Sequence, residues 1–145
     1  MDFHPFVGVG LLNFGNVRQL PAMVGGAHGS MAPGKDRLIY DEAGITVFFY
    51  SDGLIEFIGV ASPAQVSVGG VAVLGLKLVE FIAAMCTQDI RGSTVFDGIW
   101  LASDRSFSVR MTDGIVDQLT AYSREYLSRG TSVSWANPST ERGMR

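Results

Sequence analysis

The segment of this 145-residue chain that comes closest to a known catalytic or binding motif is a glycine-rich stretch near the N-terminus. Residues 29–35, GSMAPGK, match the first seven positions of the phosphate-binding P-loop pattern, but Asp36 stands where a serine or threonine should coordinate magnesium. A P-loop also needs a following helix whose backbone N–H groups point at phosphate, whereas residues 37–40 predict a strand. We therefore interpret residues 29–35 as a surface loop.

Histidine, serine and cysteine chemistry is not indicated either. His4 and His28 have no carboxylate at metal-ligand spacing and no thiol nearby, so a zinc site is not expected. No motif places either histidine as the base for a nucleophilic serine, and no Gly-x-Ser-x-Gly sequence occurs. The one cysteine, Cys86, lies in an apolar helical pattern and is expected to be inert core packing, with a reactive thiol as the alternative. We predict no catalytic residues, no metal and no cofactor.

Carboxylates gather around one segment that is expected to be a meander of strands. Convergence of these side chains at one edge could supply acid–base chemistry, so a glycosidase-like pair stays an open alternative. Turn geometry already explains Asp52, which precedes a glycine, and the Asp41–Glu42 pair before Gly44. The carboxylates concerned are Asp36, Asp41, Glu42, Asp52 and Glu56.

The elements that must position these residues are organised as an internal repeat. Residues 51–56, SDGLIE, recur as residues 112–117, TDGIVD, and in both copies an Asp-Gly pair lies between apolar runs. Asp-Gly between such runs is the strongest short-range hairpin signal. Upstream, residues 10–15 can be aligned with residues 70–75. These matches indicate a duplication, with chance similarity of two hairpins as the alternative.

The fold class expected from this order is α+β, with two tandem helix-plus-antiparallel-meander repeats and the helices packed on one face of the sheet. The two pseudo-repeats span about residues 7–62 and 66–122, and together they form a single domain, residues 1–122. Helices are expected at residues 17–24, shortened or kinked by a proline, and at residues 76–87. Extended segments are expected at residues 7–14, 37–40, 45–50, 54–60, 66–73, 94–96, 99–102, 107–111 and 115–122.

The C-terminal stretch, residues 123–145, differs in composition. It holds four of the eleven Lys and Arg but only two of the fourteen Asp and Glu. A short helix is expected over residues 123–129, followed by a polar tail. Trp135 is the candidate residue for anchoring this tail to the domain. A tail docked on the domain and a mobile tail are the two alternatives.

Composition excludes several classes of function. A chain with 47% hydrophobic and 17% charged residues is typical of a globular domain rather than a disordered one. A formal net charge of -3 has the wrong sign for a nucleic-acid-binding protein. The most apolar stretch, residues 69–85, contains Lys77 and Glu80 and is too short for a membrane span, and the N-terminus lacks the features of a signal peptide. We therefore expect a cytoplasmic protein.

An apolar excess on both sides of one strand is the most informative functional feature. In residues 45–50, ITVFFY, one parity is apolar enough for a core face, while the other carries Phe48 and Tyr50 beside a threonine. Trp100 and Phe107 repeat this aromatic enrichment in the second copy. Either the sheet is covered on both sides, or an aromatic patch flanked by carboxylates faces a partner.

The chain resembles small bacterial proteins found beside secreted polymorphic toxins. The resemblance rests on residues 8–15, GVGLLNFG, followed by a short helix to residue 25, and then on residues 40–49 and 52–58. Similar proteins are cognate immunity proteins, some of them built from repeats like those of the BamE and β-lactamase-inhibitor-protein folds. The resemblance covers about residues 7–60 and, more weakly, the second copy, and its motifs are structural.

The resemblance implies an immunity protein that binds a cognate protein toxin and blocks its active site or substrate path. The alternative is a non-enzymatic small-ligand-binding or homodimeric assembly module, in which a second copy closes the aromatic face; a soluble enzyme ranks third. In the first case aromatic anchors and acidic side chains would contact a basic toxin surface. The predicted contact residues are Phe48, Tyr50, Trp100, Asp41, Glu42 and Glu56.

Overall fold

The chain folds into two layers that are mostly β-sheet. The computed structural model describes residues 1–14, 23–24, 27–31, 37–50, 54–96, 98–124 and 126. Within these residues α1 (Leu78–Thr87) is the one continuous α-helix, and Arg124 and Tyr126 are also helical. No helix in this described part is long and apolar enough to cross a membrane.

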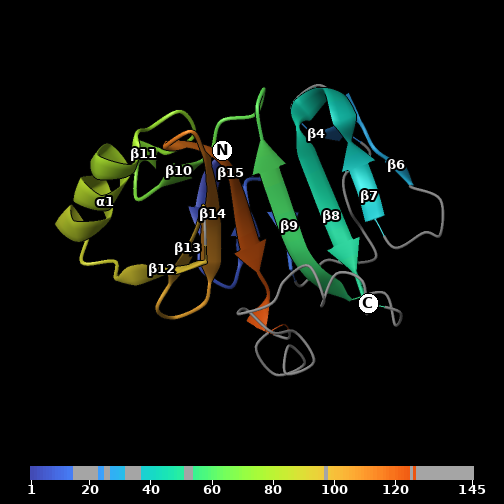
Figure 1. Ribbon diagram of the computed structural model, residues 1–145. Helices are drawn as coiled ribbons and strands as arrows, with labels where there is room; N and C mark the ends of the chain where they lie inside the picture. Colours follow the sequence, from blue (N-terminus) through green and yellow to red (C-terminus); the bar gives the residue numbers. More distant parts are fainter. Residues whose placement is uncertain are drawn as a thin grey trace.

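The larger layer is an eight-stranded antiparallel sheet (Figure 1), with the strand order β12-β13-β14-β15-β9-β8-β7-β6. Its first half is a meander of β6 (Ser30–Met31), β7 (Arg37–Tyr40), β8 (Ile45–Phe49) and β9 (Ile55–Ala61). Its second half is a meander of β12 (Gly92–Phe96), β13 (Ile99–Ala102), β14 (Phe107–Thr112) and β15 (Ile115–Tyr122). Antiparallel pairing of β9 with β15 joins the two meanders into one continuous sheet.

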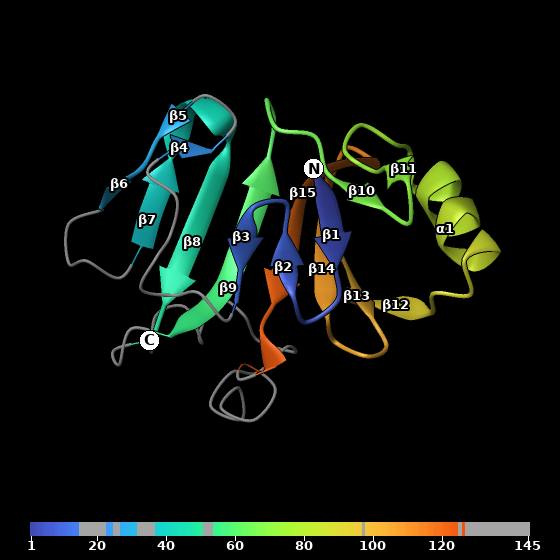
Figure 2. The ribbon, with the colours of Figure 1, turned by 180° about the vertical axis from the view of Figure 1, so that it is seen from behind.

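The smaller layer lies behind this sheet in the view of Figure 1 and in front of it in Figure 2, and it contains five short strands in the order β11-β10-β1-β2-β3. Strand β1 pairs in parallel with β10, and the other pairs are antiparallel. The strands are β1 (Asp2–His4), β2 (Gly8–Val9), β3 (Leu12–Asn13), β10 (Ser67–Val68) and β11 (Val71–Ala72). Two further short strands, β4 (Met23–Val24) and β5 (Ala27–His28), pair with each other, and the 3₁₀-helix η1 (Asp41–Ala43) connects β7 to β8.

The main core fills the space between the layers. Phe3 of β1 packs on Phe107 of β14 with ring centroids 5.0 Å apart, and Phe81 of α1 packs edge-on against Trp100 of β13 at 4.9 Å. Strand β8 shows why this face is buried, since Ile45 and Val47 alternate with partly exposed residues. The five-stranded sheet and α1 therefore cover one face of the eight-stranded sheet.

The structure confirms most of the strands expected from the sequence. Strands β7, β13 and β15 have the expected bounds, β8 and β14 differ from them by one residue at one end, and β9 is shifted by one residue at both ends. The Asp113-Gly114 turn between β14 and β15 has positive φ at both residues, 54° and 76°, as a type I′ hairpin turn requires. The equivalent Asp52-Gly53 pair lies outside the described residues, although β8 and β9 pair as a hairpin would.

The expected fold class is wrong. The chain is not built from two helix-plus-meander repeats, because α1 is the one continuous α-helix in the described part and the two meanders form one sheet. Short strands take the place of a first covering helix: Phe3 and Leu12 are buried between exposed neighbours, and Gly10, between β2 and β3, has a φ of 55° that favours a turn over a helix. Of the helix expected at residues 17–24, residues 17–22 lie outside the described residues and residues 23–24 are strand β4.

The C-terminal predictions are largely untested. Arg124 and Tyr126 are helical, which agrees with a helix beginning after Ser123. Residues 127–145, including Trp135, lie outside the described residues.

Candidate functional site

The outer face, meaning the face of the eight-stranded sheet turned away from the five-stranded sheet, is the candidate site. Strand register arranges its side chains in rows that cross several strands. The first row is aromatic: Tyr122 of β15 lies opposite Phe57 of β9, which lies opposite Phe48 of β8, with Arg37 of β7 next to it. An aromatic row of this kind on a second sheet face is unusual for a surface that only meets water.

The rings of this aromatic cluster, Phe48, Tyr50, Phe57, Tyr122 and Tyr126, pack on one another. Phe48 stacks on Phe57 with centroids 4.3 Å apart, and Tyr122 stacks on Tyr126 at 4.8 Å. Phe57 meets both tyrosines edge-on. Phe57, Tyr122 and Tyr126 are buried, whereas Phe48 and Tyr50 are half-buried at the side of the cluster. The cluster is thus closely packed, and part of the Phe48 and Tyr50 side chains remains exposed.

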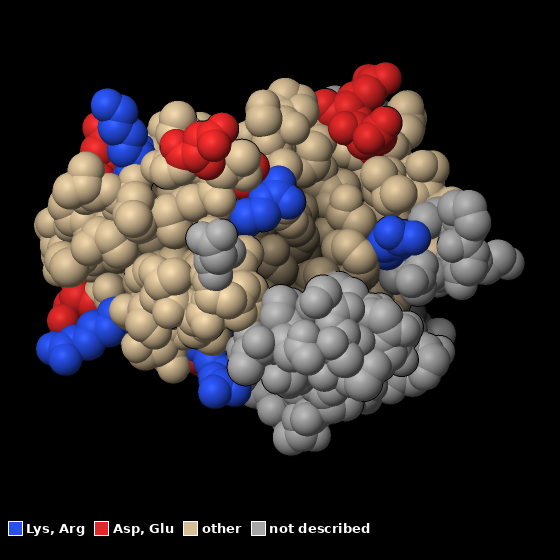
Figure 3. All heavy atoms as spheres, in the orientation of Figure 1, with Lys and Arg blue, Asp and Glu red and all other residues tan. Residues whose placement is uncertain are grey.

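A row of small side chains runs beside the aromatic row. Ser108, Thr120, Gly59 and Thr46 lie opposite one another across β14, β15, β9 and β8. Because these side chains are short, they rise little above the backbone of the sheet. Figure 3 shows a hollow over β9 near the middle of this face. A Cβ atom on Gly59 would lie 3.3 Å from Nε2 of Gln118, so the Gln118 amide borders this floor.

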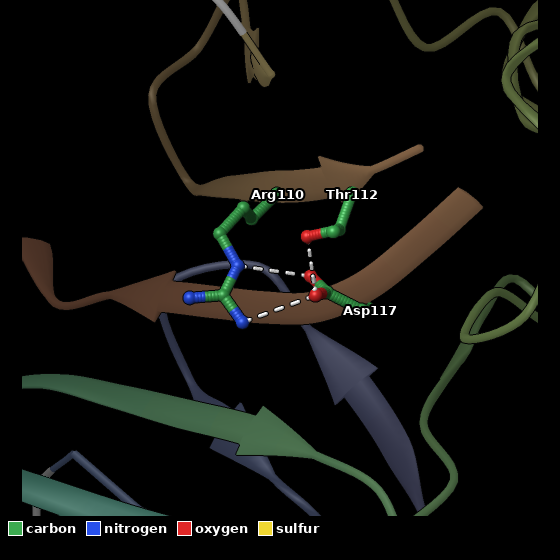
Figure 4. A network of polar contacts seen from close by, with 3 residues as sticks. All are labelled: Arg110, Thr112 and Asp117. Atoms are coloured by element: carbon green, nitrogen blue, oxygen red, sulfur yellow. Dashed lines mark hydrogen bonds and ion pairs between the residues drawn. The ribbon is translucent and has the colours of Figure 1, made fainter. Parts of the chain in front are cut away.

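A third row contains a fixed arginine. Nε and Nη2 of Arg110 donate to the two carboxylate oxygens of Asp117 at 2.9 and 3.1 Å, and Thr112 Oγ1 donates to the same carboxylate at 2.7 Å (Figure 4). The β-bulge at Arg110 and Met111 lets Asp117 and Gln118 both face Arg110. The Arg110 side chain keeps 52% of its surface in solvent, so its guanidinium is oriented before any partner arrives.

The Asp117 carboxylate has a pKa below its usual value, chiefly because of the Arg110 hydrogen bond, with Thr112 adding to the effect against partial desolvation. A lowered pKa stabilises the fold above the pKa of the unfolded chain, and that stabilisation is lost as pH falls through the folded-state pKa.

We predict that Asp117→Asn lowers the free energy of unfolding by less than about 1 kcal/mol at pH 7, since the pair is solvent-screened. The difference from the wild type should shrink below about pH 4, where the carboxylate of the unfolded chain is protonated. Urea titrations at pH 7 and at low pH measure this; a difference that grows in acid would contradict the assignment.

The structure places the six predicted contact residues at the aromatic end of the outer face, in η1 and, for Trp100, in the main core. Phe48 and Tyr50 lie together at the aromatic end of the outer face, and Glu56 sits in the bulge of β9 beside Phe57. Asp41 and Glu42 are exposed in η1, at the other end of β8. Acidic side chains gather at this upper end of the sheet in Figure 3. Strand β8, about 13 Å long at about 3.3 Å per residue, separates them from the rings.

Trp100 was expected on this surface, and that expectation is wrong. Its side chain is 3% exposed and lies in the main core between Phe81 and Phe107. It points to the opposite face because it pairs with Val109, a core residue of β14. Its neighbour Leu101 is the β13 residue that joins the aromatic cluster.

Sequence reasoning missed four residues of the outer face. Phe57 and Tyr122 lie in strands that were expected, but only the register of β9 against β15 and β8 aligns them with Phe48. Tyr126 reaches the cluster from beyond the last strand. Arg110 could have been noticed as the one charged residue of its strand, opposite the strand that carries Asp117 after the Asp-Gly turn.

Chemistry elsewhere in the described residues is sparse. Within the described ranges, no group of three or more His, Cys, Asp or Glu side chains could hold a metal ion. Cys86 is exposed on α1, which corrects its expected place in the core. Two open pockets lie at the ends of α1, of about 390 Å³ beside Cys86 and Trp100 and about 580 Å³ beside Leu78 and Gly114.

Comparison of the chain with protein-family models, with curated proteins and with solved structures finds no match.

Proposed function

We propose that this chain is a non-catalytic binding protein whose outer face covers the active site or substrate path of a protein toxin. The class of partner comes from the resemblance of the sequence to immunity proteins. The surface comes from the aromatic cluster, which is the observation that carries the proposal. We propose that the binding protein acts in the cytoplasm.

The chemistry of the outer face supports protein recognition rather than catalysis. Aromatic residues and arginine dominate the binding energy of protein interfaces. Phe48 and Tyr50 are half-buried against the other rings of the cluster, and Phe48 lies between the Phe57 ring and the Arg37 guanidinium, which is 5.9 Å from its centroid. Because these rings are already held by their neighbours, little side-chain entropy is lost on binding. Arg110, held by Asp117, offers the same advantage at the other end of the hollow.

The hollow over β9 supports insertion of a partner side chain or loop. Its floor is the row of small residues around Gly59, and it lies between the aromatic cluster and the Arg110–Asp117 pair. A partner segment that places an apolar side chain on Phe48 and a carbonyl or carboxylate near Arg110 would match both ends. Glu56 adds an acidic group at the aromatic end, as expected for a basic toxin surface.

Co-expression with the product of the adjacent gene tests this function. We expect that product alone to arrest growth, that co-expression of this chain restores growth, and that the two proteins co-elute in a stable complex. The matched control is a Phe48→Ala, Tyr50→Ala double variant, whose soluble expression is checked and which should fail to restore growth. Absence of both toxicity and a complex would contradict the proposal.

A further inference from the structure

Strand β12 forms one edge of the eight-stranded sheet, at the end where α1 lies (Figure 2). Within the described part of the chain, β13 is the one strand that pairs with it. Just before β12, the Arg91 carbonyl accepts from the Ser103 N–H at 2.8 Å, so these two residues form a hydrogen-bonded pair. Hydrogen-bonded and non-hydrogen-bonded pairs alternate along an antiparallel ladder. Gly92 and Thr94 therefore direct their N–H and C=O groups away from β13, toward the open edge.

This edge has few of the features that protect a sheet edge from a further strand. Proteins block such edges with lysine, with proline, with very short strands or with bulges. Strand β12 reads GSTVF, without lysine or proline, and Ser93 and Thr94 are exposed. Its bulge lies between Thr94 and Phe96, so residues 92–94 pair regularly with β13. These three residues can therefore pair with an extended segment on their other side.

Two pockets lie along the inner side of β12, the side that faces α1. Gly92 lines the smaller pocket, of about 390 Å³, together with Trp100, and Thr94 lines the larger one, of about 580 Å³, together with Leu78. Gly92 and Thr94 pair with Ala102 and Trp100, which are buried in the main core, so both residues face inward. Two residues span about 7 Å along a strand, which is also the spacing of successive side chains on one face of any extended segment.

One flank of α1 forms the opposite wall of both pockets. Leu78, Ile82 and Met85 are spaced i, i+4 and i+7, so they follow one side of the helix. Leu78 lines the larger pocket, and Ile82 and Met85 line the smaller one. An apolar side chain in either pocket would therefore contact apolar helix residues on one side and the edge of the sheet on the other.

We propose that an extended segment of a partner protein adds to β12 as an antiparallel strand. The two segment residues opposite Gly92 and Thr94 exchange hydrogen bonds with them, and their side chains enter the two pockets. The segment therefore carries large apolar side chains at two alternate positions. Main-chain hydrogen bonds supply affinity in such a complex, and pockets for alternate side chains supply specificity. Asp113, exposed in the lining of the larger pocket, favours a basic residue in the segment nearby.

A second copy of β12 does not match this site. Two-fold pairing centred on Ser93 would place Gly92 and Thr94 of one copy opposite Thr94 and Gly92 of the other. Glycine and threonine side chains are too small to fill pockets of about 390 and 580 Å³. The proposed segment binds at the edge and inner side of the sheet, so this inference does not rest on the toxin contact proposed for the outer face.

Fluorescence polarisation with a synthetic peptide and the full chain tests the added strand. The probe is a fluorescein-labelled nonapeptide with leucine at its fourth and sixth positions, lysine at both ends and threonine elsewhere. We expect saturable binding. A peptide of the same composition with leucine at the fourth and fifth positions should bind at least about fivefold more weakly, because its leucines point to opposite faces and one stays in water. The probe with both leucine nitrogens methylated should not bind, because it lacks the N–H donors that the pairing needs.

Thr94→Pro removes the matching donor from β12. The Thr94 N–H faces the open edge, so proline at this position breaks no hydrogen bond with β13 and is tolerated in an edge strand. We expect the dissociation constant of the probe to rise at least about fivefold, because one hydrogen bond is lost. Thr94→Val is the matched control: it keeps the N–H and should change the dissociation constant by less than about twofold. Thermal denaturation checks that both variants fold.

Several results would overturn the proposal. The first is no saturable binding of the probe. The second is equal binding of the methylated peptide, of the peptide with adjacent leucines or by the Thr94→Pro variant, because binding would then not depend on strand pairing. The Phe48→Ala, Tyr50→Ala double variant should bind the probe as the wild type does, and a loss of binding would move the peptide to the outer face. A dimer in sedimentation equilibrium that Thr94→Pro dissociates would assign the edge to a second copy instead.

Discussion

Trp100→Ala should lower the free energy of unfolding by about 3 to 5 kcal/mol, the range for a large aromatic residue removed from a core. The indole is 3% exposed and contacts Phe81 of α1 and Phe107 of β14, so its loss leaves a cavity where the helix meets the sheet. The structure leaves little room for other packing, because a Cβ on Gly92 would lie 2.3 Å from Trp100 Cζ2. Chemical denaturation followed by far-UV circular dichroism measures the change.

The control for this experiment is Leu11→Ala. Leu11 is an apolar residue with 75% of its surface exposed, and its truncation should change stability by no more than about 0.5 kcal/mol. If Trp100→Ala cost as little as the control, Trp100 would be a surface residue and the separation of the two sheet faces would be wrong.

Phe48→Ala should weaken the complex with the toxin by more than about 1 kcal/mol, a rise of at least about fivefold in the dissociation constant. The half-buried ring stacks on Phe57 at 4.3 Å and presents its remaining surface on the outer face. Its loss should reduce stability by much less than the loss of Trp100, because part of the ring already lies in water. Isothermal titration calorimetry gives the affinity, and denaturation gives the stability.

Asp41→Ala is the matched control for Phe48→Ala. Asp41 is exposed and belongs to the same hairpin, but it lies at the opposite end of β8. Its replacement should change the dissociation constant less than Phe48→Ala does. The reverse order of effects would move the interface to the acidic end of the sheet and contradict the assignment of the outer face.

Local sequence patterns predict strands well here because β-branched and aromatic runs alternate with clear turn signals. Residues 99–102 and 115–122 were expected as strands and are β13 and β15. The Asp113-Gly114 pair makes the predicted turn because aspartate and glycine tolerate positive φ better than most residues. These features depend on neighbours in the chain, which a single sequence displays.

The layer that covers the core could not be predicted in the same way. Strands β1, β2 and β3 are two or three residues long, and β1 is held by parallel pairing with β10, more than sixty residues away. Strands this short carry too few residues for a periodic pattern. The sequence also could not show on which face of the sheet Trp100 lies, because every residue of β13 is apolar. Only the pairing of Trp100 with the core residue Val109 places its side chain on the inner face.

The candidate site was predicted in part. Side chains alternate between the two faces of a strand, so the sequence indicates that Phe48 and Tyr50 lie on the face opposite to Ile45 and Val47. Assembly of the aromatic cluster depends on pairing between β9 and β15, which lie about sixty residues apart in the chain. Asp41 and Glu42 were grouped with the rings because they are near in sequence, but the length of β8 holds these two apart from the rings, whereas Glu56 lies beside them.

The most direct test of the central claim asks which face of the molecule the toxin covers. In a Cys86→Ser background, a single cysteine is placed at Thr46, in the small-residue row of the outer face, or at Leu11, on the turn between β2 and β3. The rate of maleimide labelling of each variant is then measured with and without saturating toxin. We predict that the toxin slows labelling at position 46 by at least about tenfold and leaves position 11 unchanged, as expected when one face is occluded. Protection at position 11 with unchanged labelling at position 46 would contradict the account.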